Sequence, residues 1–225
     1  MMILFGDKGG IGRYISIMED PFRRQIEFRE PRIVSCNRGQ VDVENAPQVR
    51  AFVKDTLANY RTYEPLYVVN ATGKNISGYL HKQSPDDFAA VVNANLIGSW
   101  NILQAFAQNV KGRHDASALF LSSVCARSQT VPGVSAYAAA KAGLEGLVRA
   151  AAPELARHGA RVNALRLGYF DTGMKNTIPI AAQLQIMKQI PLKEWGKCGH
   201  LLQLIKTTLI NTYMTGSIID ITGGL

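Results

Sequence analysis

The sequence predicts a single α/β domain built on a doubly wound parallel sheet, and three observations support this prediction. Short apolar runs alternate with longer segments of helical periodicity along all 225 residues. Several of the apolar runs are followed directly by glycine-containing turns. Hydrophobic residues make up 47% of the chain, which is ample for one large core. We therefore expect one domain over residues 1–225, without an internal repeat or a linker.

The order of elements is that of strands alternating with helices, as a parallel sheet requires. The predicted strands lie near residues 2–5, 25–29, 32–36, 66–69, 117–122, 161–167 and 217–221. The predicted helices lie near residues 11–19, 47–60, 85–109, 135–158 and 198–210. In an open sheet of this kind, ligands bind beyond the carboxyl ends of the strands, where the strand order reverses.

Composition and charge exclude several classes of protein. No apolar stretch approaches the roughly 18 residues of a membrane helix, and the first residues lack the layout of a secretory signal. Cys36, Cys125 and Cys198 are few and widely spaced, which favours a reducing cytoplasm over disulfides or a metal site. The net charge of +8 comes from scattered residues without a nucleic-acid-binding motif. It indicates either a solvated surface or one that attracts phosphorylated substrates, such as acyl-CoA or an acyl carrier protein.

The first apolar run leads into a glycine turn and then into a helix. Gly6, Gly10, Ile11 and Gly12 form this turn after the predicted strand at residues 2–5. Such a turn lets backbone approach phosphate groups, and the helix start adds free N–H groups. The spacing indicates a dinucleotide site, although a plain turn remains an alternative at this point.

A second pattern places three catalytic residue types together. Tyr137 and Lys141 are four residues apart on a predicted helix, so they share one face. A nearby ammonium favours a phenolate, so we expect Lys141 to lower the pKa of Tyr137 and suit it to acid–base chemistry. Ser123 ends an apolar run that is typical of a buried strand, where its hydroxyl can bind a substrate oxygen. The three alanines between Tyr137 and Lys141 allow a flat cofactor or another helix to approach closely.

Together these motifs resemble the short-chain dehydrogenase/reductase family along most of the chain. The family's glycine turn is similar to Gly6, Gly10 and Gly12, and its turn after the fourth strand is similar to the segment from Asn70 to Gly73. By the same resemblance the catalytic set is Asn95, Ser123, Tyr137 and Lys141. The resemblance further implies a Rossmann-like fold and cofactor contacts from Gly6, Gly10, Ile11, Gly12, Glu30, Asn70, Gly73, Tyr137, Lys141, Gly168 and Thr172.

The chain also departs from the family pattern. Phe5, Ala71 and Leu167 stand where the family usually has Thr, Asn and Pro, and each lies near the expected dinucleotide. The region between Gly12 and Asn70 is short, as though a helix between the second and third strands were missing. The interval from Ser123 to Tyr137 is one residue longer than usual, which leaves Ser122 as an alternative hydroxyl.

The resemblance implies reversible hydride transfer between a nicotinamide and a carbonyl or secondary alcohol. In this interpretation Tyr137 is the general acid in reduction, Lys141 holds the nicotinamide ribose, Ser123 binds the reacting oxygen, and Asn95 holds a water that relays protons. An alternative is a non-catalytic or regulatory protein that keeps the scaffold, which the shortened nucleotide region favours. The intact catalytic set argues against that alternative.

The sequence also gives predictions for the cofactor, the substrate class and the oligomeric state. Glu30 lies near the family's acidic position, so we expect NAD slightly more than NADP, although arginines flank it. The substrate is a small carbonyl or alcohol compound, and the segment from Ile190 to Leu192 is similar to 3-oxoacyl reductases, which act on acyl thioesters. Residues 173–199 are expected to form a substrate lid. By resemblance the chain forms a homodimer or homotetramer, with no metal, membrane or nucleic-acid partner.

Overall fold

The computed structural model describes residues 1–16, 33–58, 60, 63–113, 115–127, 132–172, 175 and 178–225. Its strands are β1 (Met2–Phe5), β2 (Ile33–Cys36), β3 (Leu66–Asn70), β4 (Ala116–Ser123), β5 (Ala160–Leu167) and β6 (Ile218–Ile221). Its helices are α1 (Gly10–Ser16), α2 (Ala46–Leu57), α3 (Pro85–Val92), α4 (Gly98–Ala107), α5 (Ser135–Ala156), α6 (Ile180–Gln189) and α7 (Cys198–Ile210). A π-helical segment, η1 (Asn93–Ile97), joins α3 to α4, and a short 3₁₀ turn, η2 (Val124–Ala126), follows β4.

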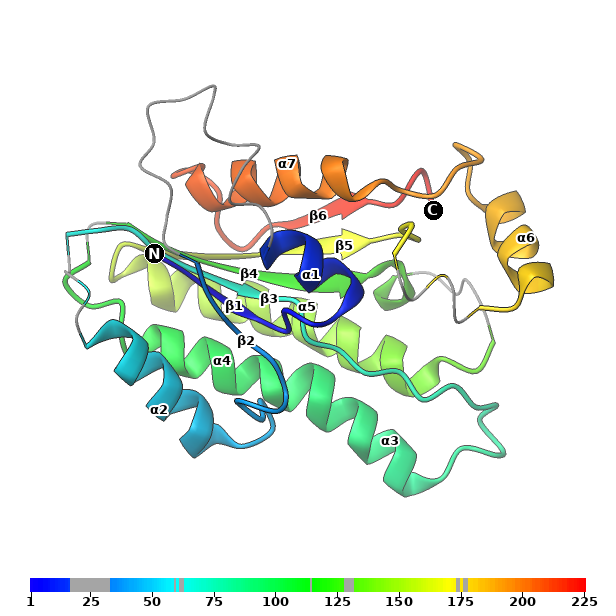
Figure 1. The fold of residues 1–225 in the computed structure, drawn as a ribbon, viewed down its shortest axis with the longest axis horizontal. Coiled ribbons are helices and arrows are strands. Elements are labelled where there is room, and N and C mark those ends of the chain that lie inside the picture. Colours follow the sequence, from blue (N-terminus) through cyan, green and yellow to red (C-terminus); the bar gives the residue numbers. More distant parts are fainter. Residues whose placement is uncertain are drawn as a thin grey trace.

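The described strands form one sheet in the order β2-β1-β3-β4-β5-β6, and all of the pairs are parallel. Helices cover both faces of this sheet, as Figure 1 shows. Strands β1, β3 and β5 are buried along their whole length, which is typical of a parallel sheet that is covered on both sides. The expected doubly wound α/β fold is therefore confirmed.

Alternating side chains of the strands pack into two hydrophobic layers. On one face, Phe120 and Ala164 lie in a core with residues of α2, α4 and α5 such as Phe106. On the other face, Leu119 and Leu165 pack with residues of α1 and α7. Neighbouring residues of a strand point to opposite faces of the sheet. The register in which the strands pair therefore determines which side chains enter each of the two layers.

The strand order reverses next to β1. From β1 the chain passes to β2 on one side and then crosses to β3 on the other side. The carboxyl ends of β1 and β3 thus border the switch point where open α/β sheets bind ligands. The close packing of Gly6 against the Ala71–Thr72 backbone marks this place in the structure.

Most predicted elements agree with the observed ones to within a few residues. The predicted helix at 85–109 exists as α3, η1 and α4 in direct succession. It begins where the Ser84 hydroxyl accepts a hydrogen bond from the Asp87 N–H, with Pro85 in the first turn. The predicted strand at 25–29 and the end of the helix at 11–19 lie outside the described residues.

Two expectations need refinement. Residues 180–189 of the expected lid form helix α6, which the sequence analysis did not assign. In the predicted order, the strand at 32–36 is the third one along the chain. Among the described strands it is the second, β2, which lies beside β1 at the sheet edge and is connected to β3 by α2. None of the helices in this part of the chain is both long and apolar enough to cross a membrane.

Phe106 of α4 is fully buried between the helix layer and the sheet. Its replacement by alanine removes buried apolar surface and leaves a cavity, so Phe106→Ala should lower the free energy of unfolding by about 3–5 kcal/mol. Urea denaturation measures this change. Tyr213→Ala is the matched control, since Tyr213 is fully exposed and its loss should cost no more than about 0.5 kcal/mol. Equal changes in the two variants would contradict the assigned core.

Candidate active site

The turn after β1 has room only for glycine at two of its positions. Gly6 has a φ of +91°, and a Cβ there would lie 2.9 Å from the carbonyl carbon of Ala71. A Cβ on Gly12 would lie 1.9 Å from the Gly6 carbonyl oxygen. Only residues without a Cβ fit at these two positions. Their glycines allow the turn, the start of α1 and the segment after β3 to approach one another.

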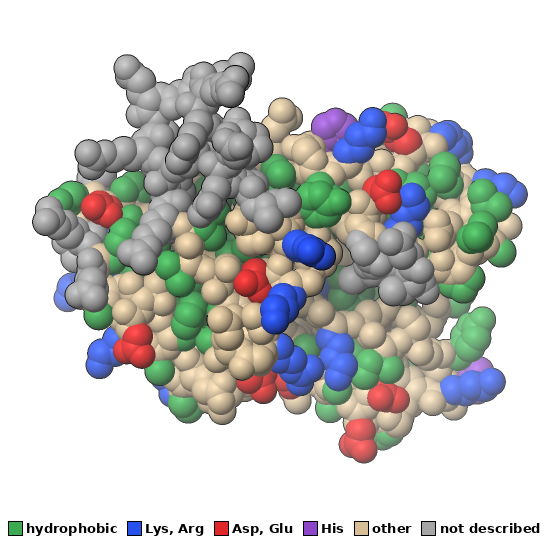
Figure 2. Space-filling model, in the orientation of Figure 1, with side chains coloured by type: hydrophobic (Ala, Val, Ile, Leu, Met, Phe, Trp, Pro, Cys, Tyr) green, Lys and Arg blue, Asp and Glu red, His purple; other side chains and the backbone are tan. Residues whose placement is uncertain are grey.

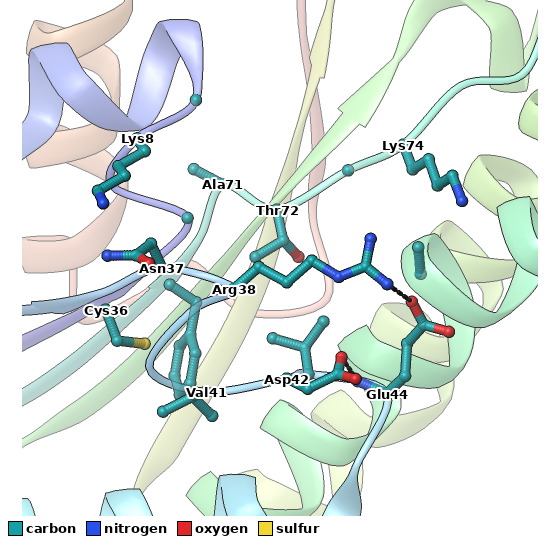
Figure 3. A pocket seen from close by; sticks show the side chains of 16 residues that line it. Lys8, Cys36, Asn37, Arg38, Val41, Asp42, Glu44, Ala71, Thr72 and Lys74 are labelled. Carbon is teal, nitrogen blue, oxygen red and sulfur yellow. Dashed lines mark hydrogen bonds and ion pairs between the residues drawn. The ribbon is translucent and has the colours of Figure 1, made fainter.

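A cavity of about 220 Å³ opens beside this turn at the switch point. Figure 3 shows that its walls come from the glycine turn, the chain after β2 and the segment after β3. The lining residues include Gly6, Lys8, Gly9, Arg38, Thr72 and Gly73. Glycine backbone, cations and a position at a topological switch point suit the phosphates and adenosine of a dinucleotide, so the described residues fit this group.

The cations of this cavity come from three separate segments. Lys8 belongs to the glycine turn, Arg38 follows β2, and Lys74 follows β3 (Figure 3). Arg38 forms an ion pair with Glu44 at 3.5 Å, and 70% of its side chain is exposed. Figure 2 shows Lys and Arg side chains gathered near the middle of this face of the molecule. An exposed, loosely paired arginine can exchange its partner for a ligand phosphate at small cost.

Asn70, a predicted cofactor residue, is buried and uses its side chain within the protein. Its Oδ1 accepts hydrogen bonds from the N–H and hydroxyl of Thr72, and its Nδ2 donates to Ser99 Oγ at 3.0 Å. These contacts fix the turn from residue 71 to residue 73. Asn70 thus shapes the cavity wall rather than lining the cavity itself.

The predicted catalytic residues of α5 and β4 lie together. Lys141 Nζ is 5.5 Å from the centre of the Tyr137 ring and donates a hydrogen bond to the Leu121 carbonyl oxygen at 2.8 Å. The side chain of Ser123, at the carboxyl end of β4, lies beside Tyr137, close enough to act on the pKa of the phenol. Tyr137 and Lys141, one turn apart on α5, therefore lie close to Ser123 at the end of β4, as expected.

Asn95 completes this group from the π-helical segment η1. Its Nδ2 donates to the carbonyl oxygens of Lys74 and Val91, at 2.6 Å and 2.8 Å. Its buried Oδ1 has no hydrogen-bond partner among the described residues. A Cβ on Gly73 would lie 3.1 Å from this Oδ1 and 3.8 Å from Lys141 Nζ. Gly73 therefore lies between the cavity and the catalytic group, and Asn95 Oδ1 is available to accept a hydrogen bond there.

The electrostatics correct one expectation about the tyrosine. Burial, with a smaller contribution from Cys125, raises the pKa of Tyr137 to about 12, although the Ser123 side chain acts in the opposite direction. Burial lowers the pKa of Lys141 to about 8. The expected lowering of the tyrosine pKa is thus wrong for the protein alone, because burial of the phenol dominates and the Lys141 ammonium donates to the Leu121 carbonyl oxygen instead.

The structure separates the two candidate serines. Ser122 is buried, and its hydroxyl donates to Glu145 Oε1 at 2.8 Å, away from Tyr137. Ser123 is half-buried and in contact with Tyr137. The hydroxyl available to a substrate is therefore that of Ser123.

Two further predicted residues, Gly168 and Thr172, follow β5 at the same sheet edge. Gly168 follows β5, and a Cβ there would lie 2.7 Å from the Thr222 backbone, so this glycine permits close packing with the chain after β6. Thr172 follows a few residues later, where its N–H donates to the Phe170 carbonyl. Neither residue lines the cavity beside the glycine turn. Glu30 lies outside the described residues.

Sequence reasoning missed Lys8 and Arg38 as cavity residues. Lys8 stands inside the glycine turn, and Arg38 stands two residues beyond the end of β2. The sequence prediction places the ribose contact at Glu30, after a second strand at 25–29, and makes 32–36 the third strand. Among the described strands, the one beside β1 at the sheet edge is β2, so Arg38 is the residue that follows it into the cavity wall.

Comparisons with known proteins agree with this geometry. The family profile described as "Enoyl-(Acyl carrier protein) reductase" matches residues 24–225. The chain is 32% identical to a 3-oxoacyl-[acyl-carrier-protein] reductase of Thermotoga maritima, over 82% of this chain and 75% of the relative. It is 33% identical to a (3R)-3-hydroxyacyl-CoA dehydrogenase of Canis lupus familiaris, over 83% of this chain and 72% of the relative.

Solved structures show the same fold. Sorbitol-6-phosphate 2-dehydrogenase from Erwinia amylovora aligns with a TM-score of 0.85 at 17% identity, covering 100% of this chain and 98% of that one. A short chain dehydrogenase family protein from Francisella tularensis aligns with a TM-score of 0.79 at 21% identity, covering 99% and 97%. The chain belongs to the short-chain dehydrogenase/reductase family. It is thus an oxidoreductase of the class that interconverts CH–OH and C=O groups.

The lowered pKa of Lys141 predicts a pH dependence in the free enzyme. Lys141 carries its proton below a pH of about 8 and loses it above, so the positive charge beside the site disappears as the pH rises. We expect kcat/KM for the nicotinamide cofactor to fall above a pH of about 8, since this parameter reports groups of the free enzyme. A profile that stays flat to the ordinary lysine pKa of about 10.4 would contradict this assignment.

Proposed function

We propose that this protein catalyses reversible hydride transfer between NAD(P)(H) and a 3-oxoacyl or 3-hydroxyacyl thioester. The observation that carries the proposal is the meeting of Ser123, Tyr137 and Lys141 beside Asn95 and Gly73, at the edge of a cavity that fits a dinucleotide. A bound nicotinamide supplies or accepts the hydride. The protein's residues must then hold the substrate oxygen and move one proton.

Tyr137 is proposed as the proton donor in reduction. Its raised pKa keeps the phenol protonated at neutral pH, as a general acid requires. The Ser123 hydroxyl would donate to the same substrate oxygen and orient it toward the tyrosine. In the opposite direction, the phenol must lose its proton first, and the positive charge of Lys141 favours that loss once substrate and cofactor bind. Asn95 Oδ1 would accept a hydrogen bond from a water on the path to Lys141.

The thioester class is supported by the relatives and by the expected lid. Two of the relatives are named as a 3-oxoacyl-carrier-protein reductase and a hydroxyacyl-CoA dehydrogenase. Helix α6 of the lid exposes Ile180 and Leu184, while Ile186 packs with Ile190 and Trp195 at its base. The exposed apolar side chains of α6 suit contact with a fatty acyl chain, while the packed side chains hold the helix in place. We propose that residues 173–199 close over the substrate.

The described residues around the cavity favour NADP(H) over the NAD suggested by Glu30. Arg38 stands at the end of β2, and Lys8 faces the same cavity from the glycine turn (Figure 3). An arginine at this place accommodates a ribose 2′-phosphate, whereas a carboxylate would bind the 2′-hydroxyl. The ion pair with Glu44 holds Arg38 across the cavity wall until a phosphate binds.

A homo-oligomer is proposed through the helices on the α5 side of the sheet. Phe88, Ile97 and Trp100 leave large apolar surface exposed on α3, η1 and α4. A second copy of the chain would cover this surface. The cytoplasmic location expected from the sequence stays a prediction.

The catalytic assignment is tested by Tyr137→Phe, which removes only the phenolic hydroxyl. We expect kcat for reduction of a short 3-oxoacyl-CoA to fall by about 10²–10⁴-fold, while the Kd for NADPH changes little. Tyr213→Phe is the control, because Tyr213 is fully exposed on a loop. Turnover of Tyr137→Phe near the level of the unmodified enzyme would refute the proposed role. A normal fold in both variants is checked by circular dichroism.

The cofactor preference is tested by Arg38→Ala. Loss of a charged hydrogen bond to the 2′-phosphate should raise the Kd for NADPH by roughly tenfold or more, with a much smaller effect on NADH. Fluorescence titration with both cofactors measures the difference. Lys54→Ala, an exposed cation of α2, is the control for general charge effects. Equal weakening of NADPH and NADH binding would contradict the preference.

A further inference from the structure

A row of three polar residues crosses the sheet one position before the catalytic serine. Ser122 of β4 lies opposite Arg166 of β5, and Arg166 lies opposite Asp220 of β6. All three belong to the strand positions that alternate with Leu121, Leu165 and Ile221 of the α7-side core. Their side chains therefore face α5, in a layer that consists mainly of apolar residues.

Helix α5 supplies the partner of this row. Glu145 Oε1 accepts hydrogen bonds from Ser122 Oγ at 2.8 Å and from Arg166 Nε at 2.9 Å. Its Oε2 accepts a second hydrogen bond from Arg166 Nη2 at 2.6 Å. Glu145 and Arg166 are only 4% and 7% exposed. One carboxylate thus binds two neighbouring strands to the helix that carries Tyr137 and Lys141.

The row continues to the turn that follows the catalytic serine. Arg166 Nη1 donates to Asp220 Oδ1 at 2.6 Å, and Asp220 Oδ2 accepts from Arg127 Nη1 at 2.8 Å. Arg127 comes directly after η2, and its Nη2 donates to the Leu225 carbonyl oxygen at 3.1 Å. Both ends of the segment from Ser122 to Arg127, which contains Ser123, are therefore held by the same charged network.

Stability alone does not account for charges at this place. Parallel strands that are covered on both faces are ordinarily apolar, and an apolar pair of similar volume would be as stable as a buried ion pair or more so. What an ion pair adds is geometry, because the bidentate arginine–carboxylate contact has one preferred orientation. The network lies where geometry matters, since Glu145 is one helical turn beyond Lys141, and Ser122 precedes Ser123.

We propose that Glu145 and Arg166 are positioning residues of the active site. Their contact, together with that between Lys141 and Leu121, sets the position of α5 along β4 and so keeps Tyr137 beside Ser123. Neither residue lines the cavity beside the glycine turn. This inference rests on the proposed roles of Ser123 and Tyr137 in the reaction.

The test replaces the ion pair by an apolar pair, in the variant E145L/R166L. We expect kcat for reduction of a short 3-oxoacyl-CoA to fall roughly 10- to 100-fold, because small displacements of reacting groups cost that much. The Kd for NADPH should stay within about twofold and Tm should not fall, because the pair is not needed for folding. A kcat within about twofold of the unmodified enzyme would overturn the inference.

A second ion pair on the same strand provides the matched control. Arg161, at the amino end of β5, is buried and donates to Asp115 Oδ1 at 2.7 Å, at the opposite sheet edge from the site. The variant D115L/R161L should keep its kcat at temperatures below its Tm, whatever its stability. An equal loss of kcat in both double variants would show a general effect of stability and overturn the inference.

A conservative variant covers the case in which E145L/R166L does not fold. R166K keeps the charge but not the two-pronged contact, so kcat should fall to an intermediate value with the Kd for NADPH unchanged. Full activity of R166K together with failed folding of the double variant would assign the pair to stability and overturn the inference.

Crystal structures distinguish this inference from the proposed function. The contact between Tyr137 and Ser123 should be present in the unmodified protein and lost or lengthened in E145L/R166L. This structural comparison can be made even if the unmodified enzyme does not reduce the chosen thioester. Such a lack of activity would count against the proposed substrate but not against the positioning role. An unchanged contact would overturn the positioning role.

Discussion

The contact on which the site depends is the hydrogen bond from the buried Lys141 ammonium to the Leu121 carbonyl oxygen. Burying a cation is costly, and the lowered pKa of Lys141 is the measure of that cost. The bond joins α5 to the end of β4, close to Ser123, which is the last residue of that strand. Tyr137, one turn earlier on the helix, is thereby held against the serine hydroxyl. The positions of all three side chains follow from one helix docked on one strand.

The same edge of the sheet serves two purposes through different kinds of residue. On the side of β1 and β2, glycines keep the backbone open, and exposed cations such as Arg38 face the cavity. On the side of β4 and β5, the side chains of Lys141, Glu145 and Arg166 are buried and hydrogen-bonded, Lys141 to the Leu121 carbonyl oxygen and Glu145 to Arg166. Loosely held cations suit a ligand that comes and goes, whereas reacting groups need fixed positions. Gly73 lies where the two sides meet.

Sequence reasoning placed Ser123, Tyr137 and Lys141 together because their positions follow from local spacing. Tyr137 and Lys141 share a helix face by period alone, and Ser123 had to end a strand because the preceding run is apolar. The choice between Ser122 and Ser123 was beyond such reasoning, since it depends on Glu145, which lies on α5 rather than on the strand. The pKa of Tyr137 was predicted in the wrong direction for the same reason. Sequence shows that a lysine is near, but not how deeply the phenol is buried.

The sequence by itself determined the class of fold and the alternation of its elements, because these follow from residue types at short, regular intervals. Its motifs also identified the family and proposed the candidate catalytic side chains. The tertiary structure alone decided which polar atoms are already satisfied and which remain available. It placed Lys8, Arg38 and Lys74 around the cavity, occupied the Asn70 side chain with Thr72, and left Asn95 Oδ1 without a hydrogen-bond partner among the described residues. These outcomes depend on contacts between residues that are distant along the chain, and the packing of helices on the sheet sets them.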